Sequence, residues 1–280
     1  MVRIAAEFLQ IIKDFSLFDD MYMNCFFKDF PEGIQFILRK ILDRSDLVVK
    51  SVHIQDVMVS MTSKTSRLDV FAEDGEGNQY DVEFQFLPNE NIPKRGRYYL
   101  GNIDQNMIRR GEDYDTLHEA YVIFICGGDP IKKHKPMYHY TMKDEDGNEL
   151  NDGQHLLILN ADYEGDWRLK DLMNDIKASD PETMKYEVLK ERAEYLKEEE
   201  EGNMQLNMNL QNLMMKAENK GIEKGIEKGR EEGIEKGREE EKTNMIFHML
   251  KEKFDVKTIM RTLNVSEETI KKSKRQCNEN

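Results

Sequence analysis

The segment from Ser66 to Phe86 constrains the fold most, because it predicts a β-hairpin. Its centre, residues 74–78 (DGEGN), has the composition of a turn, and apolar and polar residues alternate on both sides of it. If the loop is symmetric about Glu76, Asp69 lies opposite Glu83. Four apolar residues then face one another on a buried side that sets the register: Leu68, Val70, Val82 and Phe84.

Two opposed carboxylates point to metal chemistry. Directly opposed side chains have Cβ atoms about 4.5–5.5 Å apart, where like charges are destabilising. A hard cation such as Mg²⁺, which proteins hold with one or two carboxylates and water, would offset the repulsion between Asp69 and Glu83. Gln85 shares the face of Glu83 and can hold a water or a phosphate oxygen. The alternative is an exposed hairpin whose polar side happens to carry these residues.

The flanking segments predict an α/β fold. Apolar residues at helical spacing in Glu32–Asp43 predict a helix, and β-branched residues in Leu47–Val59 predict a strand. Pro93 marks the start of a second helix, which continues through Arg95–Arg110. The apolar run Tyr121–Cys126 predicts a strand buried on both faces and parallel to the preceding one. The predicted core order is αβββαβ.

This order, with Asp69 on the second strand and Glu83-x-Gln85 on the third, resembles the PD-(D/E)xK nuclease superfamily. Within it, the chain resembles the recombination-promoting nucleases, or PD-(D/E)xK nuclease family transposases, over roughly residues 15–126. Two features differ from the superfamily signature: no proline precedes Asp69, and Gln85 replaces the usual lysine. The remaining matching segments are DMYM (20–23), FFKD (26–29), RLDV (67–70), YDVEFQ (80–85), Arg95, Tyr98-Tyr99, Gly111 and Tyr114.

The resemblance implies a restriction-endonuclease-like core and metal-dependent hydrolysis of DNA. Asp69 and Glu83, with the carbonyl of Phe84, would bind Mg²⁺ or Mn²⁺, which lowers the pKa of an attacking water. Gln85 would orient that water, although glutamine cannot replace the charge of lysine.

Three more residues are candidates for the site. Asp20 either completes the acidic cluster or is an exposed acid at a helix start. Arg95 and Tyr99 lie one helical turn apart, so they share a face. They are candidates for phosphate contact, and packing against the sheet is the alternative.

Composition bounds the remaining function classes. The chain has no long apolar run, which predicts no membrane span, and its three cysteines lack CxxC spacing, which argues against disulfides and zinc. We therefore expect a cytoplasmic protein. Residues 1–200 carry 25 Lys and Arg against 40 Asp and Glu. Since DNA affinity comes mainly from neutralising phosphates, this balance opposes DNA binding unless the site is locally basic.

The C-terminal part predicts two further segments after a nuclease-like domain over residues 1–200. Residues 201–242 contain glycine at every fourth position from Gly221 to Gly237. Each glycine costs a helix about 0.8–1 kcal/mol relative to alanine, so the stripe favours close approach of two helices and a homo-oligomer through residues 203–242. A flexible charged linker is the alternative. Residues 243–280 predict two short helices that resemble a helix-turn-helix fragment, or else a helical hairpin packed on the protein.

These patterns together predict a Mg²⁺-dependent DNA endonuclease of transposase or recombination type. A non-catalytic, oligomeric DNA-binding or regulatory protein that retains the fold is the alternative.

Overall fold

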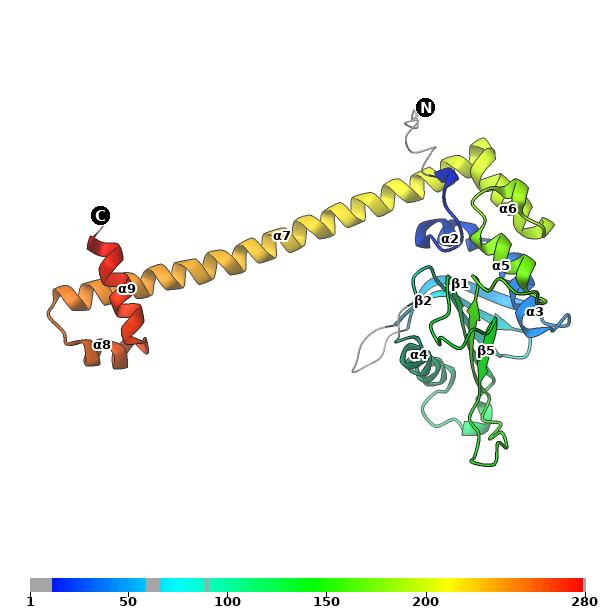
Figure 1. The fold of residues 1–280 in the computed structure, drawn as a ribbon, viewed down its shortest axis with the longest axis horizontal. Coiled ribbons are helices and arrows are strands. Elements are labelled where there is room, and N and C mark those ends of the chain that lie inside the picture. The colour runs from blue at the N-terminus through cyan, green and yellow to red at the C-terminus, as the bar shows by residue number, and fades with distance from the viewer. Residues whose placement is uncertain (1–11, 59–65, 89–90, 279–280) are drawn as a thin grey trace. The chain divides into compact units, whose positions relative to one another are not determined.

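The computed structural model describes residues 12–58, 66–88 and 91–278. In these residues, six strands form one mixed sheet in the order β1-β2-β3-β4-β6-β5 (Figure 1). The strands are β1 (Val49–Met58), β2 (Ser66–Asp74), β3 (Gln79–Gln85), β4 (Ala120–Cys126), β5 (Met137–Tyr140) and β6 (Gln154–Asn160). β1, β2 and β3 are antiparallel neighbours, β3, β4 and β6 are parallel, and β5 is an antiparallel edge strand. The predicted αβββαβ order and the α/β class are confirmed.

The β2–β3 hairpin has the predicted register. Val70 pairs with Val82 and Glu73 with Gln79, so each pair is symmetric about Glu76. The Asp74 carboxylate closes the turn, because its Oδ1 accepts hydrogen bonds from the main-chain N–H groups of Glu76 and Asn78. Gly77 has a φ of 89°, a conformation that glycine adopts without steric cost.

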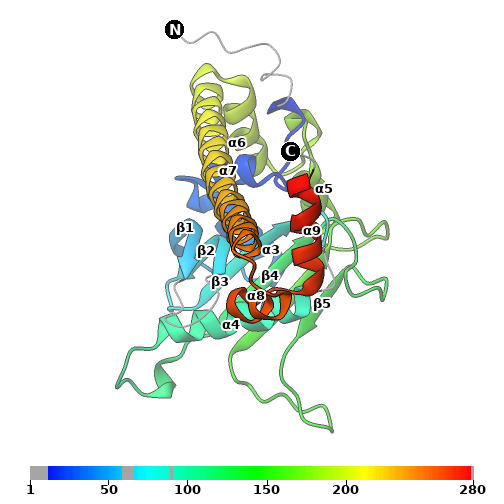
Figure 2. The ribbon, with the colours of Figure 1, turned by 90° about the vertical axis from the view of Figure 1, so that its left-hand side faces the viewer.

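Helices cover both faces of the sheet (Figure 2). On one face lie α2 (Asp20–Phe27), α3 (Pro31–Leu42), α5 (Lys170–Lys177) and α6 (Glu187–Glu198), which share a large apolar cluster with the strands. On the other face lies α4 (Ile92–Met107), over a smaller cluster. Short 3₁₀ turns occur at Tyr114–Thr116 and Pro181–Thr183.

The central strand β4 contributes to both clusters. Ile123 and Ile125 pack on the α3 side, whereas Val122 and Phe124 pack under α4. Every residue of β4 is buried, as the continuous apolar run predicts.

One prediction about the hairpin is wrong. Leu68 was expected on the same buried face as Val70 and Phe84, which pack on the α3 side. Leu68 instead packs in the cluster under α4. The pairing of β2 with β3 ends at Val70, and beyond it side chains of Asp69 and Glu83 join the two strands, so the face predicted from the hairpin register does not apply to Leu68.

Gly96 lets α4 approach the sheet closely. A Cβ atom at Gly96 would lie 2.5 Å from Cδ1 of Leu156 on β6, which is closer than atoms can pack. A larger residue would require the Leu156 side chain to move or α4, which carries the neighbouring Arg95, to shift.

The chain divides into two compact units, residues 1–212 and 213–280. The helix α7 (Glu200–Lys251) starts in the first unit, where Leu206 is buried in the main core. The packed part therefore extends past residue 200, where we expected the nuclease-like domain to end. The glycine repeat is helical, and Lys228 forms an ion pair with Glu232 within it.

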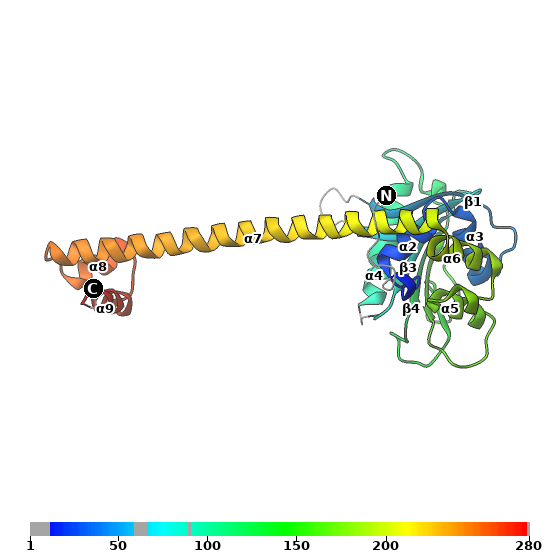
Figure 3. The same ribbon diagram turned by 90° about the horizontal axis from the view of Figure 1, so that it is seen from above.

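The second unit has a core of its own. α8 (Val256–Leu263) and α9 (Glu267–Asn278) pack with the last turns of α7 (Figure 3). Ile246, Ile259 and Ile270 are each almost completely buried at the centre. The sequence pattern indicated the last two helices, and the structure adds a third from the end of α7.

No helix in the described part of the chain is long and apolar enough to cross a membrane. Cys25 and Cys126 are buried free thiols, and the side chain of Cys277 lies outside the described part.

Candidate active site

Asp69 and Glu83 are joined across the hairpin by side-chain hydrogen bonds. The paired positions of β2 and β3 run from Glu73–Gln79 to Val70–Val82, and the two acids follow at the next position. There the main-chain N–H of Asp69 donates to Oε1 of Glu83 at 3.2 Å. The N–H of Phe84 donates to Oδ2 of Asp69 at 3.1 Å. The carboxylates thus replace main-chain partners and hold the strand ends together.

Glu83 is buried and paired with Arg95. Its side chain is 1 % exposed, and Nη2 of Arg95 lies 2.8 Å from Glu83 Oε2. Arg95 also donates from Nη1 to Oε1 of Gln85 at 2.8 Å and from Nη2 to the Tyr99 hydroxyl at 3.2 Å. The guanidinium lies over the rings of Tyr99 and Phe124, 5.5 and 5.3 Å from their centroids. These contacts fix Arg95 between α4 and the sheet.

Burial raises the pKa of Glu83 to about 8. The charge of Asp69 adds to the increase, and Arg95 opposes it. Without a further cation, removal of the carboxylate from water and repulsion by Asp69 outweigh the attraction of the guanidinium. A bound cation would reverse this balance, because it stabilises the ionised form.

Gln85 is the last residue of β3 and lies on the same face of the strand as Glu83. Its amide nitrogen donates to Oε2 of Glu83 at 3.4 Å and to the carbonyl of Phe84 at 3.2 Å. The structure thus brings together Asp69, Glu83, Gln85, Arg95 and Tyr99. The prediction that Arg95 and Tyr99 share a face of α4 is confirmed, since both contact this cluster.

Asp20 lies at the first position of α2 and is exposed. Its charge acts on Glu83, contributing to the raised pKa of that carboxyl group. Asp20 is therefore near the acidic pair but is not held by it through any hydrogen bond within the described part.

Asp81 is an additional site residue that our sequence reasoning missed. It is fully buried, and neither carboxylate oxygen has a hydrogen-bond partner among the described residues. Burial, then Glu83 and Asp69, raise the pKa of Asp81 well above its usual range. The signal was available: Asp81, Glu83 and Gln85 alternate along β3, so they share one face.

The donor set fits a hard divalent cation. Asp69 and Glu83 are joined across the hairpin by their carboxylates, the Phe84 carbonyl lies beside Gln85, and the Asp81 oxygens have no hydrogen-bond partner among the described residues. Mg²⁺ needs only one or two carboxylates, since water and substrate complete its shell. No group of three or more His, Cys, Asp or Glu that could hold a metal ion occurs in the described residues.

The family comparison agrees with this arrangement. A family model described as PD-(D/E)XK nuclease family transposase matches residues 34–262, a span that contains both carboxylates, Gln85 and Arg95. A search of curated proteins and a search of solved structures found no match. Because the family model covers more than half of the chain, and the αβββαβ core carries the acidic pair on its second and third strands, this protein belongs to the PD-(D/E)XK nuclease family transposases.

Proposed function

We propose that this protein is a Mg²⁺-dependent DNA endonuclease of transposase or recombination type. The observation that carries the proposal is the interlocked pair of Asp69 and Glu83 at the end of the hairpin, where one carboxylate is buried beside Arg95. Burial of a carboxylate next to another is unfavourable for stability, and such arrangements are concentrated at functional sites.

Asp69, Glu83 and the Phe84 carbonyl would hold the metal ion. When bound, Mg²⁺ or Mn²⁺ would lower the pKa of a water molecule and neutralise charge on the phosphate. The protein's own part is positional: the reciprocal hydrogen bonds keep Asp69 and Glu83 at the same level of the hairpin.

Gln85 would orient the attacking water through its amide group, while Arg95 positions both Gln85 and Glu83. A guanidinium has five N–H donors, and three are used within the described part of the chain. The other two would contact a phosphate oxygen. Tyr99 would support this geometry from beneath the guanidinium.

Exposed cations occur in the two segments next to the site. Two exposed cations of α4, Lys94 and Arg97, flank Arg95. The loop after β4, residues 127–136, adds exposed Lys132, Lys133 and Lys135. This loop starts at the site, because the N–H of Gly127 donates to the carbonyl of Gln85 at 2.9 Å. A local basic rim would attract phosphates despite the acidic balance of residues 1–200.

The glycine repeat supports a proposal of self-association through residues 203–242. A Cβ atom added at any of Gly221, Gly225, Gly229, Gly233 or Gly237 would meet nothing within 4 Å outside the adjacent helix backbone. Contacts within the chain therefore do not explain why glycine occupies these positions. Ile222, Ile226 and Ile234 are exposed beside them, as expected if a second copy packs on this helix. The helix-turn-helix-like assignment of residues 243–280 remains a proposal as well.

A cleavage assay on supercoiled plasmid tests the proposed activity. We expect nicking with Mg²⁺, none with a chelator, and none for Glu83→Ala under either condition. An intact plasmid that the protein nevertheless retards in a gel would favour the alternative, a non-catalytic DNA-binding or regulatory protein. If the plasmid is neither cleaved nor bound, the result contradicts both the endonuclease and the DNA-binding alternative.

A further inference from the structure

A histidine pair lies at the other end of the sheet from the acidic site. Nε2 of His139 on β5 and Nδ1 of His155 on β6 are 3.1 Å apart. His155 on β6 pairs with Tyr121, which lies near the start of β4. Glu83 on β3 pairs with Phe124, which lies farther along β4. The histidine pair is therefore separate from the carboxylate pair.

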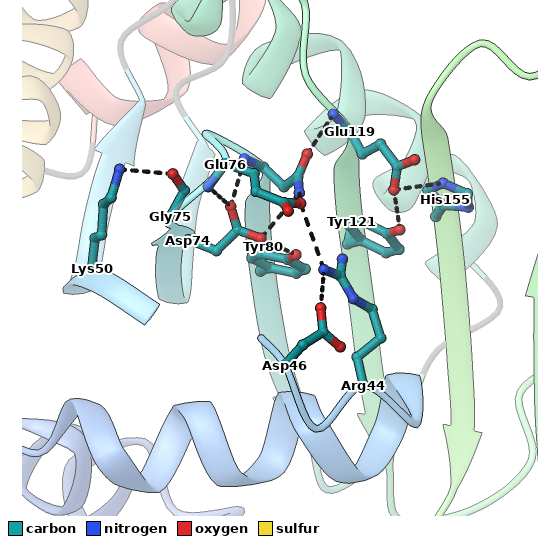
Figure 4. A network of polar contacts seen from close by, with 11 residues as sticks. Arg44, Asp46, Lys50, Asp74, Gly75, Glu76, Tyr80, Glu119, Tyr121 and His155 are labelled. Carbon is teal, nitrogen blue, oxygen red and sulfur yellow. Dashed lines mark hydrogen bonds and ion pairs between the residues drawn. The ribbon is translucent and has the colours of Figure 1, made fainter. Parts of the chain in front are cut away.

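The ring of His155 is held in place from two sides. It stacks on Tyr121 with the centroids 4.3 Å apart and an interplanar angle of 12°, and Tyr121 stacks in turn on Tyr80. Oε2 of Glu119 lies 3.6 Å from Nε2 of His155 and also accepts a hydrogen bond from the Tyr121 hydroxyl (Figure 4). A carboxylate at Nε2 favours the tautomer with its proton there, which leaves Nδ1 as the lone pair facing His139.

We propose that His139 Nε2 and His155 Nδ1 form a binding site for a transition-metal ion of the Zn²⁺ class. With Zn–N bonds of about 2.0–2.1 Å, two nitrogens 3.1 Å apart subtend about 95–102° at the metal, between octahedral and tetrahedral values. Glu119 then acts as the carboxylate partner that metal-bound histidines commonly have on their second nitrogen.

The chemistry of the site distinguishes it from the acidic pair. Imidazole nitrogens suit Zn²⁺, Cu²⁺ and Ni²⁺, whereas Mg²⁺ takes oxygen ligands. A surface pocket of about 290 Å³, lined among others by Glu119, Thr141, Glu149 and His155, opens beside the pair and gives access to water. Since no third metal-binding side chain joins them in the described residues, water fills the remaining positions.

Metal binding would stabilise the pairing of the edge strand β5 with β6. Among the described strands, β5 pairs only with β6, over the four residue pairs from Met137–Leu159 to Tyr140–Leu156. A metal between His139 and His155 would join these two strands through their side chains and stabilise the edge. Metal binding by the histidine pair is independent of nuclease activity.

The test measures Zn²⁺ binding to the full chain carrying Asp69→Asn, so that the proposed carboxylate site does not contribute. After dialysis, we expect about one equivalent of Zn²⁺ per chain. We expect a loss of at least about tenfold in affinity in both His139→Gln and His155→Gln. His118→Gln is the matched control, because His118 is an exposed histidine that lines the same pocket, and it should bind as the parent does.

A second readout identifies the ligands without relying on the variants' stability. Co²⁺ added to the parent should give visible absorption bands of a nitrogen-ligated ion, and Zn²⁺ should displace them. Equal Zn²⁺ binding by all four proteins would overturn the proposal, as would no binding by the parent. In the latter case the pair is only a hydrogen bond between two imidazoles.

Discussion

The main-chain N–H of Asp69 donates to the side chain of Glu83 across the hairpin, while the Asp69 carboxylate accepts from the residue after Glu83. Each acid is therefore held by the strand that carries the other. Their relative position depends on the β2–β3 register, which the symmetric DGEGN turn sets. An insertion in that turn would separate the two carboxylates even though both residues remained.

Divalent metal should stabilise the folded protein. Mg²⁺ or Mn²⁺ that binds Asp69 and Glu83 only in the folded state, and so displaces the proton that Glu83 holds at neutral pH, should raise the Tm by roughly a few degrees at saturating concentration. Asp69→Asn should abolish the rise, whereas Asp146→Asn, in an exposed turn, should keep it. Scanning calorimetry with and without millimolar Mg²⁺ measures both. An unchanged Tm in the parent would contradict a preformed metal site.

Glu83 and Gln85 should differ in their effect on cleavage. Glu83→Ala removes a metal ligand and should eliminate nicking, whereas Gln85→Ala should only slow it, because a neutral amide orients water without holding the charge of the metal. Single-turnover nicking of supercoiled plasmid measures the two rates. Equal and complete loss in both variants would show that the amide of Gln85 is essential.

Removal of the Arg95 guanidinium should destabilise the protein, and more so at high pH. Arg95→Met deprives Glu83 and Gln85 of their donors, a loss of about 1–3 kcal/mol in the free energy of unfolding. The loss of stability should be larger at pH 9 than at pH 6, because Glu83 is ionised at pH 9 and its buried charge is then stabilised by the guanidinium. Urea unfolding at the two pH values measures it. Arg97→Met, at an exposed position of the same helix, should change stability by less than about 0.5 kcal/mol.

The raised pKa of Glu83 should make the metal-free protein less stable as pH rises. Between the usual glutamate pKa of about 4.5 and the folded value of about 8, the folded state holds a proton that the unfolded state has released. Stability then decreases with increasing pH across this window, by on the order of a few kcal/mol. Glu83→Gln should flatten that part of the profile, and exposed Glu145→Gln should not. Parallel profiles for Glu83→Gln and the parent would refute the assignment.

The glycine repeat should control the oligomeric state. We expect the full chain to self-associate and a chain ending at Asn212 to be monomeric; this end point retains Leu206, which belongs to the core. In the full chain, Gly229→Leu should weaken association by forcing the helices apart, whereas Lys228→Leu, on an adjacent face, should not. Light scattering gives the masses. A monomeric full chain would identify residues 203–242 as a solvated linker.

Local chemistry made much of the fold predictable. The turn residues and the period-two alternation determined the hairpin and its register, and the continuous apolar run determined that β4 is buried on both faces. Those signals are readable in sequence because they depend on neighbours a few residues apart. The spacing of Arg95 and Tyr99 likewise placed both on one face of α4.

Other features depended on contacts between distant segments. Asp81 is fully buried, and the charge of Arg95 on α4 acts on it, so its environment depends on segments that are distant in the sequence. Leu206 of α7 is buried in the main core, although the sequence predicts that the nuclease-like domain ends before it. The end of α7 also supplies the third helix of the core of the second unit. The sequence by itself determined the elements, the hairpin register and the two opposed carboxylates, because these follow from local propensity and periodicity. Only the tertiary structure decided which charges are buried and which residues pair with them, because burial and pairing arise where segments far apart in the chain pack together.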